Sequence, residues 1–444
     1  MRKKLAILAV VVALAVAGGV VAYLAFGRSP PEGGLDTELE GVTLVQPPVE
    51  TELLPEPPAP PEPPGTTVEE PPPVSTSEVP PAPPPEPEEG PCWPYFGGDP
   101  QRTLAREDIE LGRPVKPTIW ARAMGSYMEY PPSFCDGTLY VNTFDGLTVA
   151  LEAETGKVLW QWQGGVKAST PAIAGSRLIV SSHDGSVTAL RRSNGRVLWQ
   201  LQTGAKVESS PLVLDDTAYF GSTDGRLFAV DVATGEVRWA YDTAGRINSS
   251  PSAFGDRIYI STYAGSVLCL DRRTGEELWT TYVERDAFRY ESFYASPSTD
   301  GERVYTMART GKVVAFDARD GGIVWTQHVN ALGYSTPAIA HGMVFVGGFD
   351  GALHAYEAET GAPVWETTVG GRALAPALVV GDLVFFSTLE TKTYALRVRD
   401  GRVVWTFNAG KYAAGIATNE RYYFSLNGLL VAFEGSRTAP EEGS

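Results

Sequence analysis

The stretch AVDVATGEVRW at residues 229–239 decides the fold, because its pattern A-x-D-x-x-T-G-x-x-x-W returns along the chain. Seven of eight regularly placed tryptophans end a copy of this pattern, with substitutions, and neighbouring tryptophans lie 39, 40 or 46 residues apart. An internal period near 40 residues is typical of the blades of a β-propeller. The eight tryptophans are Trp120, Trp160, Trp199, Trp239, Trp279, Trp325, Trp365 and Trp405.

One repeat, residues 209–241, has the sequence of four short strands. The apolar runs are β-branched and aromatic, and none has helical spacing over a useful length. Asp224-Gly225 suits a two-residue hairpin turn, because glycine accepts positive φ there. We therefore predict antiparallel strands at 212–214, 218–220, 227–230 and 237–241. The blade near residue 390 has Glu390-Thr391-Lys392 at the second turn, which predicts a longer or looser hairpin.

The two ends of the repeat region indicate how the ring closes. Trp120 has no inner strands before it, and the last unit, 413–434, has three strands and no tryptophan after them. The strand around Trp120 should therefore complete the last blade, which removes the exposed sheet edges. We predict an all-β, eight-bladed propeller of four-stranded antiparallel blades at 92–436, with a disordered tail at 437–444.

The N-terminal part predicts a membrane anchor followed by a spacer. Leu5 to Phe26 carries no charge, and basic residues precede it, so residues 1–28 should be an uncleaved transmembrane signal anchor with the rest exported. A cleaved signal peptide ending near residue 17 is the alternative. Residues 29–91 hold 21 of the 35 prolines and no Lys or Arg, which predicts a disordered, extended Pro/Glu-rich linker.

Charge and composition restrict the functions that the chain can have. Most of the formal net charge of −17 lies in the linker, and the remaining body is mildly acidic, which argues against nucleic acid as a partner. The sequence shows no catalytic constellation, no C-x-x-C and four widely separated histidines, so we expect neither a catalytic nor a metal site. Cys92 and Cys135 either pair in a disulfide or stay free, and export permits the pair.

A candidate binding face consists of the loops that join each outer strand to the next inner strand. Six of these loops each supply one basic residue, and their convergence would attract a carboxylate- or phosphate-bearing ligand or an acidic protein segment. Solvated loop charges are the alternative reading. The insertion at 282–294 is rich in aromatic residues and arginine, which predicts a partner contact. The candidate residues are Lys167, Lys206, Arg246, Arg289, Tyr290, Arg372 and Lys411, with Tyr127, Glu129, Tyr130, Glu208, Asn248 and Tyr334 in the same loops.

The tryptophan-ended repeat and the stretch Trp93–Pro100 together resemble the PQQ-like β-propeller repeat family, over about residues 92–434. This resemblance implies one of two branches. Quinoprotein dehydrogenases use PQQ and calcium, but they carry large insertions and often adjacent cysteines, which this sequence lacks. The BamB-like branch is non-catalytic and eight-bladed.

The resemblance and the anchor together set the functional expectation. We expect a single-pass membrane protein with a monomeric propeller outside the cytoplasm, which binds cell-envelope proteins and needs no cofactor. The alternative is a sensor of PQQ or another anionic ligand, or a quinoprotein-like oxidoreductase.

Overall fold

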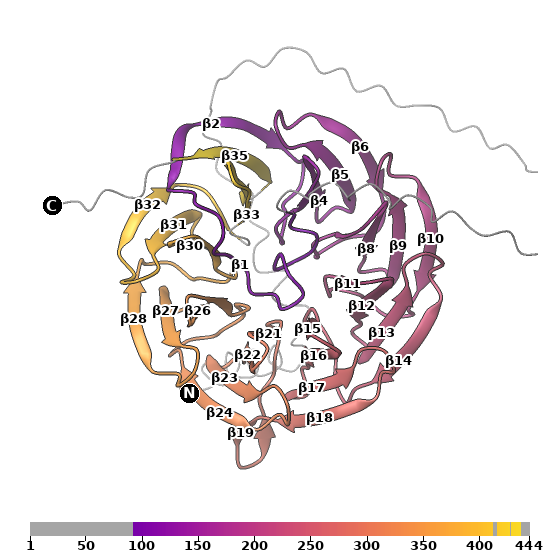
Figure 1. The fold of residues 1–444 in the computed structure, drawn as a ribbon, viewed down its shortest axis with the longest axis vertical. Helices are drawn as coiled ribbons and strands as arrows, with labels where there is room; N and C mark the ends of the chain where they lie inside the picture. The colour runs from indigo at the N-terminus through magenta and orange to yellow at the C-terminus, as the bar shows by residue number, and fades with distance from the viewer. Residues whose placement is uncertain (1–91, 412–414, 427, 437–444) are drawn as a thin grey trace, which may run out of the picture. The chain divides into compact units, whose positions relative to one another are not determined.

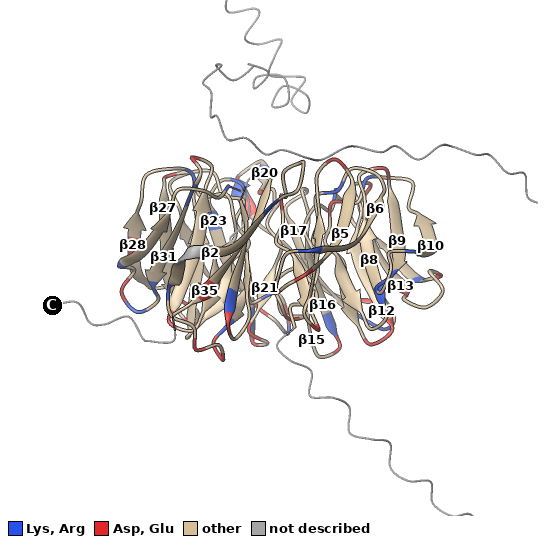
Figure 2. Cartoon of the chain, turned by 90° about the horizontal axis from the view of Figure 1, so that it is seen from above, with Lys and Arg blue, Asp and Glu red and all other residues tan. Residues whose placement is uncertain are grey.

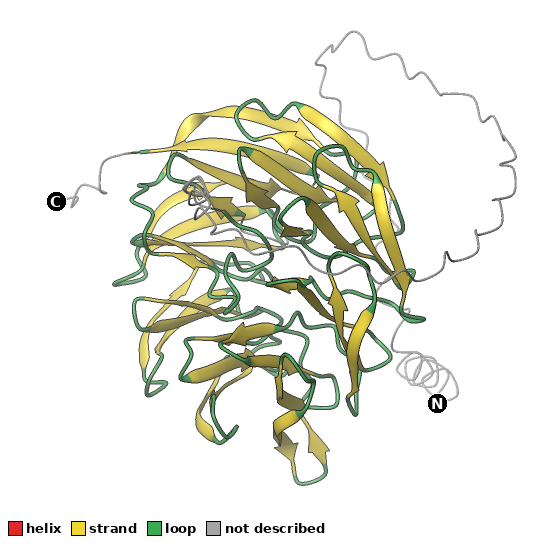
Figure 3. Ribbon diagram, turned by 45° about the vertical axis from the view of Figure 1, so that its right-hand side comes forward, coloured by secondary structure: helices red, strands yellow, loops and turns green. Residues whose placement is uncertain are grey.

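The computed structural model describes residues 92–411, 415–426 and 428–436, which form eight four-stranded antiparallel blades around one axis (Figure 1). The predicted anchor, linker and tail at 1–28, 29–91 and 437–444 lie outside these residues. The described part consists of strands and loops (Figure 3), and no helix within it is long and apolar enough to cross a membrane.

In each of blades 1 to 4, the strands lie in the order of the sequence, and the chain runs from the innermost to the outermost strand. The predicted strands at 212–214, 218–220, 227–230 and 237–241 are confirmed to within one residue at each end. The strands are β3 (Ser133–Cys135), β4 (Thr138–Asn142), β5 (Leu147–Glu152) and β6 (Val158–Gln163); β7 (Ala172–Ala174), β8 (Arg177–Ser181), β9 (Ser186–Arg191) and β10 (Val197–Gln202); β11 (Leu212–Leu214), β12 (Thr217–Gly221), β13 (Arg226–Asp231) and β14 (Val237–Asp242); and β15 (Ser252–Phe254), β16 (Arg257–Ser261), β17 (Ser266–Asp271) and β18 (Glu277–Tyr282).

Blades 5 to 8 continue the ring, and the last blade closes it with a strand from the start of the chain. Trp120 of β2 pairs with Ala432 of β35, which confirms the predicted closure. The strands are β21 (Ser298–Thr299), β22 (Arg303–Met307), β23 (Lys312–Asp317) and β24 (Ile323–His328); β25 (Ala338–Ala340), β26 (Met343–Gly347), β27 (Ala352–Glu357) and β28 (Pro363–Thr368); β29 (Leu378–Val380), β30 (Leu383–Thr388), β31 (Lys392–Arg397) and β32 (Val403–Phe407); and β33 (Ile416–Ala417), β34 (Arg421–Leu426), β35 (Leu429–Gly435) and β2 (Pro114–Ala123).

Two hairpins depart from the simple repeat. In blade 7, Thr388 pairs with Lys392, so this hairpin is tight and the predicted longer or looser turn is wrong. The backbone can close here because Thr391 adopts a positive φ of 61° in place of the usual glycine. The insertion between blades 4 and 5 forms a short hairpin of its own, β19 (Glu284–Asp286) and β20 (Arg289–Tyr290), which projects beyond the ring (Figure 1).

Each blade contacts the next through the repeated tryptophan. Trp199 on the outer strand β10 donates its indole N–H to the carbonyl of Val232 in blade 3 at 2.9 Å, and its ring lies on Gly235. A buried indole needs such a partner for its single donor. Trp405 contacts Phe424 and Phe433 of the closing blade. The same indole-to-carbonyl bond is made by Trp120, Trp160, Trp239, Trp279, Trp325 and Trp365.

Residues 92–106, the central segment, run through the middle of the ring before the chain reaches β2 (Figure 1). This segment ends in β1 (Ala105–Arg106), which pairs in parallel with β29. The backbone of the central segment also accepts N–H bonds from the innermost strands of other blades. The donors are Phe134, Ile173, Ala253, Thr299, Ile339 and Val379, from blades 1, 2, 4, 5, 6 and 7.

Arg102 joins the central segment to a further blade. Its side chain is completely buried and donates to the carbonyls of Phe96, Ser210 and Pro251. Burial lowers the pKa of the guanidinium to about 9, which still leaves it charged at neutral pH. The residues Ser210 and Pro251 belong to the Ser-Pro pairs ahead of β11 and β15, so one side chain joins blades 3 and 4.

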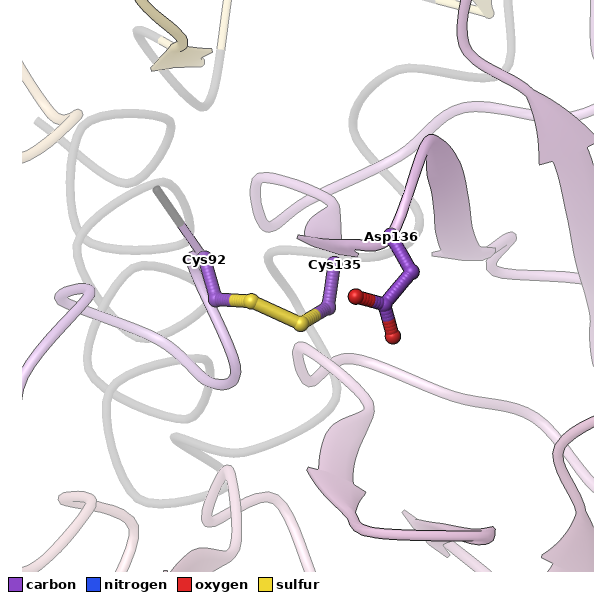
Figure 4. Close-up of side chains that lie close together, drawn as sticks. All are labelled: Cys92, Cys135 and Asp136. Carbon is purple, nitrogen blue, oxygen red and sulfur yellow. A yellow bond between two sulfur atoms is a disulfide. The ribbon is translucent and has the colours of Figure 1, made fainter. Parts of the chain in front are cut away.

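A disulfide between Cys92 and Cys135 fixes the start of the central segment to the inner strand of blade 1 (Figure 4). The two Cα atoms are 4.5 Å apart, and the neighbouring Trp93 and Phe134 exchange two backbone hydrogen bonds. Cys269, on β17, is buried and forms no disulfide. Of the two alternatives that the sequence allows, a disulfide or two free thiols, the described structure has the disulfide.

Candidate functional site

The candidate site lies at the end of the blades that carries the loops between blades, which we call the loop face. In blades 1 to 7, the second hairpin turn reaches the same face and is held there by a backbone bond to the preceding loop. The amide of Tyr263 donates to the carbonyl of Arg246 at 3.0 Å, and that of Phe349 donates to Leu332 at 3.1 Å. This bond recurs in blades 1 to 7, so each blade presents a loop residue beside a turn residue.

Arginine and aromatic side chains from blades 4 to 7 form a continuous band on the loop face. The guanidinium of Arg246 lies 5.1 Å from the centre of the Tyr263 ring, and that of Arg309 lies 5.7 Å from the Tyr334 ring. Such stacking is favourable for guanidinium groups that keep contact with water. This arginine–aromatic band comprises Arg246, Tyr263, Tyr294, Arg309, Tyr334, Phe349 and Arg372.

An acidic cluster lies beside the band on the loops that enter blades 1, 3 and 4. The carboxylate of Glu208 pairs with the ammonium of Lys206 and accepts from the side-chain amide of Asn248. Burial, reinforced by the nearby Glu208, raises the pKa of Glu129 to about 7. Burial also lowers the pKa of His183, whose ring nitrogen lies 3.8 Å from Glu208, to about 4. The site therefore holds a carboxyl group that exchanges its proton near neutral pH.

The central segment contacts the loops of this face from the middle of the ring. The ring of Tyr130 packs edge-on against Phe96 at 5.4 Å, and burial raises the pKa of the Tyr130 hydroxyl far above its usual range. Arg102 lies close enough to oppose that shift in part. Aromatic rings of Phe96 and Tyr130 therefore pack beneath the loops and turns of the loop face.

The seven basic and aromatic residues predicted from the sequence do not gather into one positive cluster. Lys167 is 1% exposed, and its ammonium donates to the carbonyls of Gly146 and Gly165. Burial lowers its pKa to about 8. A buried ammonium bound to carbonyls contributes little to attraction of a ligand from solvent. Lys167 is therefore better described as a support of its loop.

Of the other predicted residues, two belong to the band, two to the hairpin, and Lys206 to the acidic cluster. Arg246 and Arg372 belong to the arginine–aromatic band, although Arg372 also pairs with Glu390 at 3.0 Å. Arg289 and Tyr290 lie on the projecting hairpin, where Arg289 pairs with Asp286 at 2.7 Å. The expected convergence is wrong for these two, because the insertion folds outward as β19 and β20. Lys411 is partly buried at the end of the loop after β32.

Opposite charges lie beside one another at this face, and blue and red segments alternate near β20 (Figure 2). Lys206 pairs with Glu208 and Arg372 with Glu390, so these basic residues each have an acidic neighbour. Sequence reasoning missed the turn half of the site, because it considered only the loops. The sequence does mark these residues, because each of them stands two positions before the glycine of its turn. These residues are Phe144, His183, Tyr263, Arg309 and Phe349.

Ligand-type side chains for a metal ion meet at one place in the described residues, where Cys92, Cys135 and Asp136 lie within 4.8 Å (Figure 4). Both sulfur atoms are already bonded to each other, so they cannot serve as thiolate ligands. The carboxylate of Asp136 is engaged by Arg192 at 2.5 Å. This group therefore has the chemistry of a structural crosslink.

Comparison with known proteins gives one family and one fold. The model of the family described as outer membrane protein assembly factor BamB matches residues 115–306, 264–351 and 309–439. BamB from Moraxella catarrhalis has a TM-score of 0.64 at 18% identity and covers 72% of this chain and 100% of its own. No curated protein sequence matches the chain.

Two enzymes share the same propeller. A europium-containing methanol dehydrogenase has a TM-score of 0.67 at 15% identity, covering 76% of this chain and 89% of its own. The quinohemoprotein alcohol dehydrogenase from Comamonas testosteroni has a TM-score of 0.66 at 14% identity. The match covers 80% of this chain and 82% of the dehydrogenase. Similarity at such low sequence identities shows the fold alone, and BamB and the two dehydrogenases share that fold.

Proposed function

The chain belongs to the family of the outer membrane protein assembly factor BamB, and on that premise we propose that its propeller is a protein-interaction scaffold of the cell envelope. The proposal includes an anchor at 1–28 and a spacer at 29–91 that hold the propeller outside the cytoplasm. An uncharged run of the length of Leu5 to Phe26 and a proline-rich stretch without basic residues support that part.

The observation that carries the proposal is the hairpin of β19 and β20. It forms a separate two-stranded sheet between blades 4 and 5, and the described ring closes without it. Its tip residue Phe288 is 95% exposed, and the rings of Tyr282 and Tyr290 contact each other at its base. An exposed aromatic residue among paired charges is the composition of an interaction hot spot. The hairpin therefore offers a partner an anchor beside the arginine–aromatic band.

Crosslinking in cells followed by co-purification of the full-length protein tests this proposal. The variant F288A/Y290A removes the aromatic contacts of the hairpin and leaves the blades unchanged. The control is F254A, because Phe254 is 45% exposed at the end of the blades away from the loop face. We expect one set of envelope proteins with the unmodified chain and the control, and its loss with F288A/Y290A. Equal capture by all three chains would contradict the proposal.

The arginine–aromatic band favours a second candidate, the binding of a flat anionic molecule. Arg246 and Arg309 both lie over the ring of Tyr263, so a planar carboxylate could stack and pair there. PQQ, a flat tricarboxylate used with a divalent cation, fits this donor set in part. The cation part does not fit, because Glu208 is already bound by Lys206 and Asn248. We therefore assign no reaction to the site.

A titration separates this candidate from the scaffold. Full-length protein would be titrated with PQQ, with and without calcium, beside the variant R246E. Stoichiometric uptake that R246E abolishes would favour the ligand-binding function. Equal signals from both chains would count against it, and the crosslinking result would then decide the function.

A further inference from the structure

A groove on the outer edge of the ring, between blades 1 and 2, differs from the equivalent grooves elsewhere. It lies at the end of the blades opposite to the loop face, and its volume is ≈ 680 Å³. That size is within the usual range for sites that hold a small organic molecule. Three arginines, Arg177, Arg191 and Arg192, line it together with Leu159, Trp160 and Leu198.

The equivalent grooves at blades 3 and 5 neutralise their own arginines. In the groove after blade 3, Arg238 pairs with Asp216 at 2.6 Å and Arg272 pairs with Asp215 at 3.0 Å. In the groove of blade 5, Arg319 pairs with Asp317 at 2.7 Å. These carboxylates belong to the linings themselves, so both grooves already contain the anions that their arginines require.

The groove between blades 1 and 2 keeps one such pair, Arg192 with Asp136, but neither Arg177 nor Arg191 forms an ion pair with the described residues. The third strand of blades 3, 4 and 5 ends in an aspartate, at Asp231, Asp271 and Asp317, whereas the third strand of blade 2 ends in Arg191. The described residues that line this groove include no Asp or Glu. A position that supplies a negative charge elsewhere thus supplies a positive one here.

The three arginines of the groove differ in their surroundings. Arg192 donates to the hydroxyl of Tyr140 at 2.9 Å and pairs with Asp136, which lies outside the lining. The Nε atom of Arg177 is buried and makes no hydrogen bond to the described residues. A buried donor without a partner costs free energy. Arg191 is exposed at the groove opening.

We propose that this groove binds a phosphate monoester that carries an apolar group. The three guanidinium groups and the carboxylate of Asp136 leave two formal positive charges, which match a phosphate dianion. Guanidinium forks fit phosphate oxygens in pairs. Leu159, 51% exposed, and Leu198, 37% exposed, lie on the same groove and suit the apolar part of the ligand.

Calorimetric titration of the full-length protein tests the site with three probes: phenyl phosphate, inorganic phosphate and phenylacetate. We expect phenyl phosphate to bind most tightly at pH 7.5. Inorganic phosphate lacks the apolar group, and phenylacetate has a single charge. Binding of phenyl phosphate should weaken at pH 5, because its second proton associates at about pH 6. Phenylacetate binding as tightly as phenyl phosphate would overturn the assignment to phosphate.

Two variants decide whether the groove is the binding place. R191D restores the residue type that blades 3 to 5 carry, and R177M introduces the residue found at the start of β26 in blade 6. Both should fold, and each should weaken phenyl phosphate binding about tenfold or more by removing a charge-assisted contact. The control R113D makes the same change of charge as R191D at an exposed position before β2. Binding unchanged in R191D, or weakened equally in R113D, would overturn the proposal, as would no binding to the unmodified chain.

Discussion

At the scale of single residues, Glu129 has an environment that opposes its ordinary ionisation. Its carboxyl group is largely shielded from water, and the carboxylate of Glu208 is near, so its pKa rises from 4.5 to about 7. Folding therefore favours the protonated form. The stabilisation from that proton is complete below about pH 4.5 and is lost as the pH rises through 7, since the unfolded chain then releases the proton more easily.

We therefore predict that Glu129→Gln abolishes the loss of stability that the unmodified chain suffers when Glu129 ionises as the pH rises. Relative to the unmodified chain, the variant should gain about 2 kcal/mol of unfolding free energy between pH 5 and pH 8, because Gln stays neutral throughout. Urea unfolding at both pH values gives the difference. Glu276→Gln, at an exposed turn, serves as the control and should show no such trend. A flat difference for Glu129→Gln would show that the folded site tolerates its charge.

At the scale of elements, each blade rests on its neighbour through an indole ring and a turn glycine. Gly235 has a φ of 80°, and a Cβ atom added there would lie 2.7 Å from the ring of Trp199. Gly255 also has a positive φ, of 58°, but nothing lies within 4 Å of the corresponding Cβ position. The two glycines therefore separate backbone strain from blade-to-blade contact.

We expect Gly235→Ala to cost about 3 kcal/mol of unfolding free energy and Gly255→Ala about 1 kcal/mol, since only the first adds a steric clash to the strain of a positive φ. Chemical denaturation of both variants measures the difference. A further sign is the fluorescence of Trp199, which should change in Gly235→Ala alone. Equal losses in both variants would mean that the glycine is needed for its φ and that the indole can move.

Much of the architecture could be predicted because the repeat reports it directly. The spacing of the tryptophans gives the number of blades, and the unpaired start at Trp120 gives the closure. The path of residues 92–106 could not be predicted, because six innermost strands bind it through backbone groups, which leave no side-chain pattern in the sequence. For the candidate site, the loops were identified, but whether a charge is paired depends on neighbours in space. Glu208 beside Lys206 is a pair that only the fold reveals.

At the scale of the whole molecule, the blades are linked through the middle as well as around the circumference. The central segment accepts hydrogen bonds from the amides of Ile173, Ala253, Thr299, Ile339 and Val379, in five different blades. A propeller joined only between neighbours could lose blades one at a time, as repeat proteins do. Because the blades share the central segment, opening one blade disturbs a segment to which the other blades are also bonded.

Hydrogen exchange measures this coupling. We predict that the five amides exchange at one common, slow rate and that urea accelerates them together, because the same global unfolding must release each of them. Amides of the outer strand β14 should exchange faster. Five clearly different rates would indicate that the blades unfold independently and that the central segment does not couple them.

The position of the central segment has a consequence for the timing of synthesis. Trp93 donates its indole N–H to the carbonyl of Ala417, a contact between groups 324 residues apart. A ribosome makes Trp93 among the first residues of the propeller and Ala417 among the last, and β35, the partner of β2, follows later still. Contacts this distant in sequence form slowly. The nascent chain must therefore leave the indole of Trp93 and the pairing edge of β2 without their partners until the eighth blade has been translated, and that interval is when it most needs a chaperone.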